Sequence, residues 1–133
     1  PGSLNGDRHQ GIYMPDGRLL IQFRDNTPRN RPGNEMSPTE GDWVGWVGSW
    51  DDLKNGYEGQ FRIRFKDNKK GWDTTYPAAE LLPDGTLVCT TYGHWEEGEQ
   101  PYILSFRFKA NLLDNKLKEQ RKNALGRIQN VMN

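Results

Sequence analysis

The chain has little cysteine, no excess of either charge and few hydrophobic residues. Cys89 is the single cysteine, so an intramolecular disulfide is excluded and cysteine usage indicates no cellular compartment. The 18 basic and 18 acidic side chains cancel, which gives no support for a nucleic-acid partner. We expect no signal peptide or membrane span, because no run of residues is long and apolar enough.

Metal and cofactor motifs are also missing. The two histidines lack metal-ligand spacing to a cysteine or carboxylate, so no zinc site is predicted. No glycine-rich phosphate loop occurs, and no Ser-His-Asp arrangement is recognisable. We therefore predict a chain without a metal or cofactor.

Aromatic and turn-forming residues are plentiful. Only 33% of the 133 residues are hydrophobic and mean hydropathy is −0.97, so five Trp, five Tyr and five Phe must supply much of one small core. The 15 glycines and 8 prolines suit many short strands joined by turns.

An internal repeat organises the sequence. Residues 8–24 (RHQGIYMPDGRLLIQFR) superpose without a gap on residues 76–92 (YPAAELLPDGTLVCTTY), 68 positions further on. Pro-Asp-Gly marks a tight hairpin turn in each copy, and apolar residues flank both turns. The two copies therefore predict hairpins whose strands are covered on both faces. Arg8 and Tyr76 stand at the same position, at the start of each hairpin.

Further strands extend each hairpin into a meander. We expect strands at 8–14, 18–24, 43–50 and 59–66, with a long polar loop at 25–42 and a turn at 51–58. The last strand alternates strictly. Phe61, Ile63 and Phe65 are predicted to face inward, and Arg62, Arg64 and Lys66 to face water.

This pattern predicts an all-β chain made of β-propeller blades, each a four-stranded antiparallel meander. Residues 8–66 make one blade. Residues 76–109 make a second, incomplete blade with strands at 76–82, 86–92 and 102–109, so that blades occupy 1–109. Residues 110–133 read as a C-terminal α-helix packed on the blades through one apolar stripe: Leu113, Leu117, Ala124, Ile128 and Met132.

Two blades cannot close a propeller. The chain is therefore expected either to be the C-terminal piece of a longer protein or to assemble as copies into a ring. In either arrangement Arg8 and Tyr76 open the innermost strands of neighbouring blades, at the end where a central pit would bind a small ligand. An arginine there offers a planar fork for a carboxylate. A tyrosine offers a phenol that can attack, stack or donate a hydrogen bond.

The runs LNGDRH (4–9), YMPDGRL (13–19) and FRD (23–25) resemble the late blades of the sialidase (neuraminidase) family of six-bladed propellers. WVGWVGSWDD (43–52), EGQ (58–60) and YPAAELLPDGT (76–86) carry the same resemblance. It covers residues 4–109, about two of the six blades. Residues 49–56 stand where the family has its Asp-box (BNR) repeat, and keep its Ser and Asp but not its Thr-Trp end.

The family resemblance implies a retaining exo-glycosidase that removes terminal sialic acid. Its enzymes clamp the sugar carboxylate with three arginines and attack with a tyrosine, an exception to the two-carboxylate scheme. By position, Tyr76 corresponds to the nucleophile and Arg8 to the last clamp arginine. The other arginines, the acid/base aspartate and the activating glutamate belong to earlier blades. A secreted or periplasmic location is implied by the resemblance alone.

Each candidate also has a structural interpretation. Arg8 could form a buried ion pair with Asp7, Asp25 or Asp73, and Glu80 a buried structural hydrogen bond. Four more candidates for substrate binding lie at the same end: Arg24 and Asp25, which could instead pair with each other, and His94 and Trp95, of which Trp95 could stack on a sugar or simply pack.

Three functions stay open at this point. The first is the C-terminal part of a sialidase-like hydrolase, inactive as an isolated chain. The second is a non-catalytic propeller module that binds glycans or proteins, and the third is a blade module of which three copies form a ring. The expected partners are a sialoglycan-type carbohydrate and the rest of the propeller, from a parent chain or from other copies.

Overall fold

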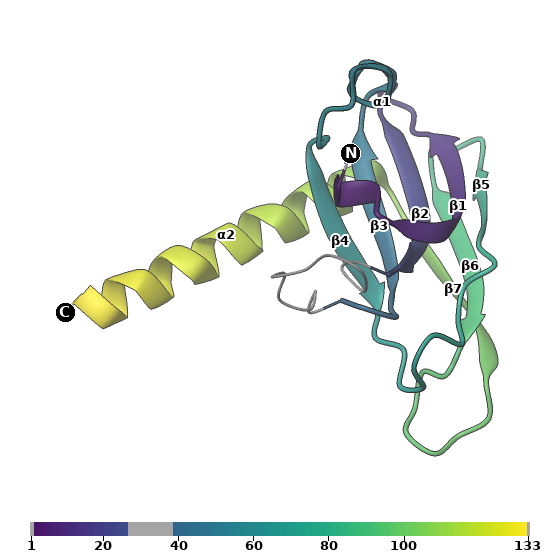
Figure 1. The fold of residues 1–133 in the computed structure, drawn as a ribbon. Coiled ribbons are helices and arrows are strands. Elements are labelled where there is room, and N and C mark those ends of the chain that lie inside the picture. The colour runs from purple at the N-terminus through teal and green to yellow at the C-terminus, as the bar shows by residue number, and fades with distance from the viewer. Residues whose placement is uncertain (1, 27–38, 133) are drawn as a thin grey trace.

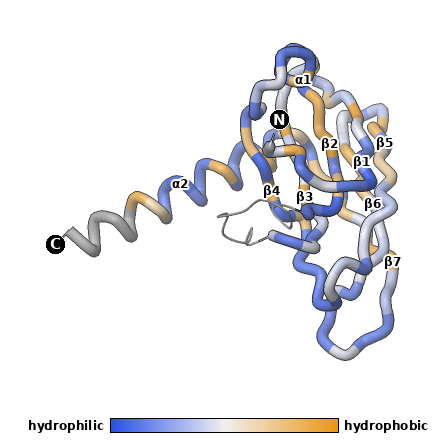
Figure 2. Tube along the Cα trace, in the orientation of Figure 1, coloured by the Kyte–Doolittle hydropathy of each residue, from blue (hydrophilic) through white to orange (hydrophobic). Residues whose placement is uncertain are grey.

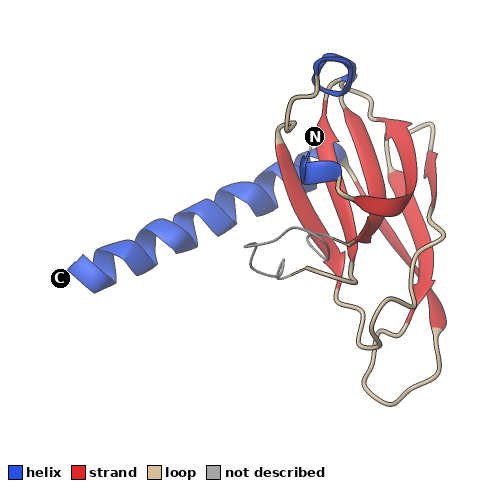
Figure 3. Cartoon of the chain, in the orientation of Figure 1, coloured by secondary structure: helices blue, strands red, loops and turns tan. Residues whose placement is uncertain are grey.

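The computed structural model describes residues 2–26 and 39–132, so the middle of the expected loop at 25–42 lies outside the described residues. Two antiparallel sheets follow one another along the chain (Figures 1 and 3). After a 3-10 turn at Gly2–Leu4, the first sheet comprises β1 (Gly6–Tyr13), β2 (Leu19–Asp25), β3 (Trp43–Gly48) and β4 (Phe61–Lys66) in that order. The second comprises β5 (Ala78–Leu81), β6 (Leu87–Gly93) and β7 (Tyr102–Phe108). Two helices, α1 (Trp50–Asn55) and α2 (Ala110–Met132), complete the fold.

The two Pro-Asp-Gly turns have the same structure, which confirms the repeat as a structural unit. Gly17 and Gly85 both adopt φ of +87°, a conformation that glycine adopts without steric cost. The amide of Gly17 donates to the carbonyl of Met14 at 3.0 Å, and the amide of Gly85 donates to that of Leu82 at 2.9 Å. In each turn the aspartate side chain accepts from the backbone amide two residues later.

The main core lies where the two sheets face each other. Trp43 is completely buried and packs against Phe65, Trp95 and Phe106, so both sheets contribute to one aromatic cluster. A smaller cluster covers the opposite face of the first sheet, formed by Leu19, Phe23, Val44 and Trp46. Figure 2 shows the resulting apolar colour along β2 and β3. The prediction that the strands of both hairpins are covered on both faces is confirmed for β2 alone. It is wrong for β1 and β5, which are partly or fully exposed as the outer strands of their sheets, and β6 is fully buried only at alternate residues.

The expected turn at 51–58 is instead mainly a short helix, and the strand expected at 43–50 ends at Gly48. Ser49 caps α1: its hydroxyl accepts from the amide of Asp52, whose carboxylate accepts from the amide of Ser49 in return. Gly56 ends the helix in the left-handed conformation. Ser49, the serine at the Asp-box position, is thus the N-cap of this helix, but its capping partner is Asp52 and not Asp51, the aspartate at the Asp-box position.

The prediction that the basic residues of β4 face water is confirmed for Arg64 and Lys66, which are exposed, but Arg62 is only partly exposed. Arg62 forms an ion pair with the fully buried Asp25 at 3.0 Å, and Arg64 with the buried Asp42 at 3.0 Å. The inward-facing alternate residues of β4 do pack against the main core. Buried carboxylates need such partners, which explains why this face of the strand is not simply solvated.

Helix α2 is present as predicted, but only its beginning packs on the sheets. Leu113 is buried and Leu117 is partly buried, whereas Ala124 is exposed. The guanidinium of Arg18 holds the helix start through two 2.9 Å hydrogen bonds to the carboxylate of Asp114. The rest of α2 projects away from the sheets (Figure 1). The side chains of Ile128 and Met132, predicted to continue the stripe, lie outside the described residues.

The chain is therefore mainly β, with two successive antiparallel meanders and a C-terminal helix, as the sequence predicts. Edge strands β1 and β5 lie side by side, where the two sheets meet. The described residues form no closed barrel or propeller.

Candidate functional site

Arg8 and Tyr76 meet where the two sheets join. Arg8 lies on β1, and Tyr76 lies just before β5, slightly outside the strand predicted to begin there. The guanidinium carbon of Arg8 lies 4.1 Å from the centre of the Tyr76 ring, a cation–π contact. Their predicted convergence is thus confirmed, whereas their roles in catalysis and substrate binding stay predictions.

The backbone is strained on both sides of this contact. Arg8 has φ of +59° and Thr75 has φ of +75°, and they are the only non-glycine residues with positive φ in the described ranges. The register of β1 against β2 shifts between Asp7 and Gln10, so Arg8 lies in a bulge. Strain of this kind, especially at a β-branched threonine, gathers at functional sites. It marks the junction as a candidate site without reference to any family.

The guanidinium of Arg8 is anchored through one nitrogen. Nη1 donates to the carbonyls of Thr74 at 2.9 Å and Thr75 at 3.3 Å, and to the phenol of Tyr92 at 3.3 Å. Nη2 and Nε donate to no described residue. The ion pair with Asp7, Asp25 or Asp73 that we weighed for Arg8 does not form. A planar edge with two N–H groups is therefore left for an outside acceptor.

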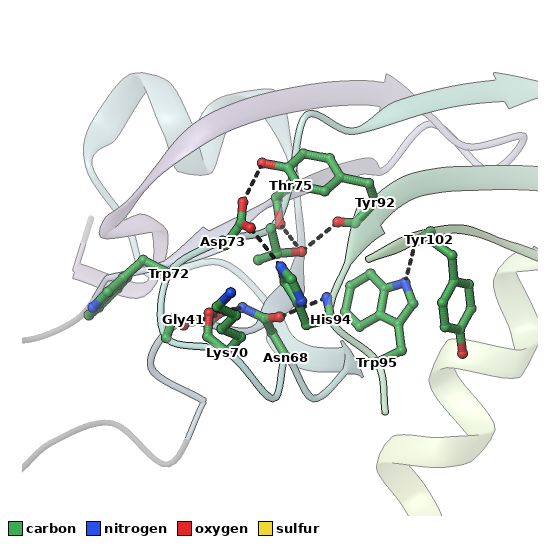
Figure 4. A network of polar contacts seen from close by, with 12 residues as sticks. Gly41, Asn68, Lys70, Trp72, Asp73, Thr75, Tyr92, His94, Trp95 and Tyr102 are labelled. Atoms are coloured by element: carbon green, nitrogen blue, oxygen red, sulfur yellow. Dashed lines mark hydrogen bonds and ion pairs between the residues drawn. The ribbon is translucent and has the colours of Figure 1, made fainter. Parts of the chain in front are cut away.

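A polar network extends inward from Tyr92 (Figure 4). The Tyr92 phenol donates to Oδ1 of Asp73 at 3.2 Å, and Nε2 of His94 lies 2.6 Å from Oδ2 of the same carboxylate. The hydrogen bond from His94, with that from Tyr92, holds the pKa of Asp73 below its usual value. Because an ionised carboxylate only accepts, Nε2 of His94 carries the donated hydrogen.

Asn68 holds the segment that carries Asp73. Its buried side-chain amide donates to the carbonyls of Gly41 and Gly71, and its carbonyl oxygen accepts from the amide of His94 at 3.0 Å. The backbone amide of Asn68 donates to Oδ1 of Asp42 at 2.8 Å. These bonds tie the connection between the two sheets to the ends of β3 and β6.

Asp42 lies beneath this connection and is 3% exposed. Burial raises its pKa to about 7, although the amide of Asn68 and the guanidinium of Arg64 favour the ionised form; the nearby Asp67 carboxylate adds to the rise. Asp42 is thus a buried acid that titrates near neutral pH. It serves the fold rather than the Arg8 surface.

The second pair of predicted residues is structural. Arg24 and Asp25 do not pair with each other: Arg24 binds the Asp7 carboxylate with two hydrogen bonds of 2.8 and 2.5 Å and donates to the Trp72 carbonyl. Asp25 is fully buried, pairs with Arg62, and accepts from the Thr39 hydroxyl at 2.5 Å. Alternation explains the split, because neighbouring residues of β2 face opposite sides of the sheet.

The side chains of His94 and Trp95 point into different surroundings. His94 is buried behind Asp73, whereas Trp95 is only 2% exposed, packs on Trp43, and donates from Nε1 to the carbonyl of Tyr102 at 3.0 Å. Trp95 therefore presents no ring for stacking on a sugar in this conformation. Glu80, expected to form a buried hydrogen bond, is exposed and forms none with described residues.

The side-chain amide of Gln22 links the two sheets close to the site. This fully buried side chain donates from Nε2 to Oε1 of Gln10 and to the carbonyl of Ala78, both at 2.8 Å, and accepts from Nε1 of Trp43 at 3.0 Å. It therefore connects its own strand, β2, to β1, β3 and β5, and so links the two sheets. No buried polar residue was predicted in this place.

Sequence reasoning missed three polar residues of the site: Tyr92, Asp73 and Thr75. Tyr92 had a signal, because it ends the second repeat and corresponds to Arg24 in the first. Asp73 was considered only as an ion-pair partner for Arg8. The positive φ of Thr75 could not be predicted from the sequence, since threonine does not favour that conformation.

A separate groove of about 110 Å³ lies between β4, β7 and the start of α2, with Phe65, Phe106 and Leu113 in its lining. No set of three or more His, Cys, Asp or Glu side chains within residues 2–26 and 39–132 is placed to hold a metal ion. None of the described helices is both long and apolar enough to span a membrane.

Comparisons with protein families, with curated proteins and with solved structures gave no match to this chain. The resemblance to sialidases therefore stays a prediction that depends on the sequence runs quoted above. The evidence for a site is the geometry at the junction of the sheets: a cation on an aromatic ring, strained backbone on both sides, and a polar network that runs from the exposed Asp73 to the buried His94.

Proposed function

We propose that this chain supplies two neighbouring blades of a six-bladed, sialidase-like propeller, and that Arg8 and Tyr76 bind and attack a terminal sialic acid or related sugar. The observation that carries the proposal is the 4.1 Å contact between these two side chains, at the junction of the sheets. Two sequential meanders that meet along their first strands are the arrangement expected of adjacent blades.

Arg8 suits the role of a carboxylate clamp. Three acceptors fix Nη1, while Nε and Nη2 keep a free edge of the kind that binds a carboxylate through two parallel hydrogen bonds. Because the guanidinium is already held by backbone carbonyls, little side-chain entropy is lost when a ligand binds.

Tyr76 suits the role of nucleophile. Its side chain is 69% exposed and its hydroxyl has no hydrogen-bond partner among the described residues. In the retaining reaction that the family resemblance implies, the phenol oxygen bonds to the anomeric carbon and passes its proton to the activating glutamate of an earlier blade. The bond to the aglycone breaks as the acid/base aspartate protonates the leaving oxygen, and water then hydrolyses the glycosyl-enzyme. A neutral phenol meets less repulsion from the sugar carboxylate than an anionic nucleophile would.

The remaining groups of such a site must come from outside these two sheets. The outer face of the second sheet is available for a further blade, because Ile103 is 73% exposed and Glu80 and Arg107 are also exposed there. That blade belongs to a longer parent chain or to another copy. The first of these, with the isolated chain inactive, is our proposal.

The test uses a longer protein that contains this segment, assayed with a fluorogenic sialoside. Tyr76→Phe should lower kcat by at least a hundredfold, whereas Tyr57→Phe, which alters a similarly exposed tyrosine beyond α1, should leave it unchanged. Equal rates for Tyr76→Phe and wild type would reject the nucleophile. If the wild type binds sialosides without cleaving them, the non-catalytic glycan-binding propeller is favoured. One observation already supports that alternative: within the described residues, no carboxylate lies against the phenol of Tyr76 to activate it.

A further inference from the structure

We propose that Tyr92, Asp73 and His94 form a relay of positioning residues that fixes the guanidinium plane of Arg8 and so directs its free edge toward a ligand carboxylate. The identity of that ligand rests on the proposed function, but the ordering of Arg8 does not. No residue of the relay is assigned a role by the sialidase resemblance.

The relay begins at Nη1 of Arg8. Two of its three acceptors are backbone carbonyls of Thr74 and Thr75, both fully buried residues. The third is the Tyr92 phenol, and within residues 2–26 and 39–132 it is the one partner of Nη1 that belongs to a side chain. The Tyr92 ring also stacks beside Tyr76, with centroids 6.2 Å apart, so the aromatic pair and the guanidinium form one surface.

The phenol of Tyr92 can accept from Arg8 only if its own hydrogen points elsewhere. Asp73 provides that direction, since its Oδ1 accepts the phenol hydrogen at 3.2 Å. The lowered pKa of Asp73 keeps the carboxylate ionised and therefore accepting at neutral pH. Removing the charge from Asp73 would free the phenol to rotate away from the guanidinium.

His94 is the buried end of the relay. Its side chain is 7% exposed, its Nε2 lies 2.6 Å from Asp73, and its backbone amide is bound by Asn68. Asp73 itself is 53% exposed, so without His94 its carboxylate would sample several rotamers in water. Figure 4 shows His94 between Asn68 and Asp73, with Tyr92 beyond the carboxylate.

The experiment measures the Arg8 side chain directly, by ¹⁵N NMR of the 133-residue chain. Wild type should show a resolved Arg8 Nε–H with slowed rotation of the guanidinium. Tyr92→Phe and Asp73→Asn should average those signals, while Tyr57→Phe should not. His94→Ala should act like Asp73→Asn, and His94→Gln, which keeps a donor near Asp73, should restore part of the ordering. Backbone spectra and melting temperatures establish that each variant is folded.

A second measurement adds N-acetylneuraminic acid to a longer protein that contains this segment, with its methyl ester as the uncharged control. The acid should shift the Arg8 Nε–H signal, and its affinity should fall about three- to tenfold in Tyr92→Phe, the loss expected for one hydrogen bond. Unchanged Arg8 dynamics in folded Tyr92→Phe and Asp73→Asn would overturn the relay. Altered dynamics without any response to the acid would uphold the relay and count against the sugar ligand.

Discussion

Replacing Gln22 with leucine should test whether one buried amide holds the two sheets together. Gln22 is 0% exposed, and its side chain makes hydrogen bonds to Gln10, Ala78 and Trp43. Leucine has nearly the same size and forms none of them. It would leave the indole N–H of Trp43 without a partner at a site that is also 0% exposed.

The magnitude follows from those three bonds. Each contributes about 1 kcal/mol net, and a donor left unsatisfied in the core costs about 1–3 kcal/mol. Burying the leucine side chain offsets roughly 1–2 kcal/mol of this loss. We therefore expect the free energy of unfolding to fall by about 2–5 kcal/mol, a large part of the ~5–15 kcal/mol typical of a small domain.

Urea denaturation followed by tryptophan fluorescence measures this change. With a slope of about 2 kcal/mol per molar urea, the middle of the usual range, the midpoint should fall by roughly 1–2.5 M. Gln100→Leu is the matched control, because Gln100 is exposed and bonds to no described residue, and its midpoint should not move. If Gln22→Leu unfolds at the wild-type midpoint, the amide does not hold the sheets and this reasoning fails.

Three further outcomes follow from the fold. Folding raises the pKa of Asp42 to about 7, so between about pH 4 and 7 the folded chain retains a proton that the unfolded chain has released. The free energy of unfolding should therefore decrease as pH rises through this range. In pH-dependent melts, Asp42→Asn should flatten that decrease. Leu113→Ala should cost about 2–4 kcal/mol in urea melts, and Leu125→Ala on the exposed part of the same helix less than ~0.5 kcal/mol; equal costs would refute the view that only the start of α2 is docked. A double-mutant cycle of Arg18→Ala and Asp114→Ala should give a coupling of about 1 kcal/mol, since the pair is bidentate but partly solvated, and additive effects would show that it does not hold the helix.

Local sequence signals predicted the hairpins well. The Pro-Asp-Gly turns need glycine at one position and an aspartate that accepts from the backbone amide two residues later, and both requirements can be read from the residues alone. Helix α1 was missed although its signal was equally local. Ser49 and Asp52 have capping-box spacing and Gly56 follows as a C-cap, but the helix is too short for apolar periodicity to reveal it.

Long-range pairing was beyond the sequence. The alternation in β4 correctly placed Phe61 and Phe65 toward the core, but it gave no hint that Arg62 would meet Asp25. Nothing local distinguishes a solvated arginine from one whose partner lies on another strand. Trp95 shows the same limit: a polar loop surrounds it in sequence, whereas in space it packs against Trp43.

The position of the candidate site depends on the same long-range contacts. Arg8 and Tyr76 come close because β1 and β5 are neighbours, and those strands are neighbours because Gln22 reaches the carbonyl of Ala78 and Arg8 reaches those of Thr74 and Thr75. The repeat predicted that the two side chains would occupy equivalent places. It did not predict that the arginine would stack on the tyrosine ring, or that Arg8 and Thr75, on either side of this contact, would have positive φ. Strain of about 1–3 kcal/mol at each of these residues persists only if surrounding bonds enforce it. The carbonyl anchors of Nη1 supply that enforcement, so the ligand-binding edge and the strained backbone form one structural unit.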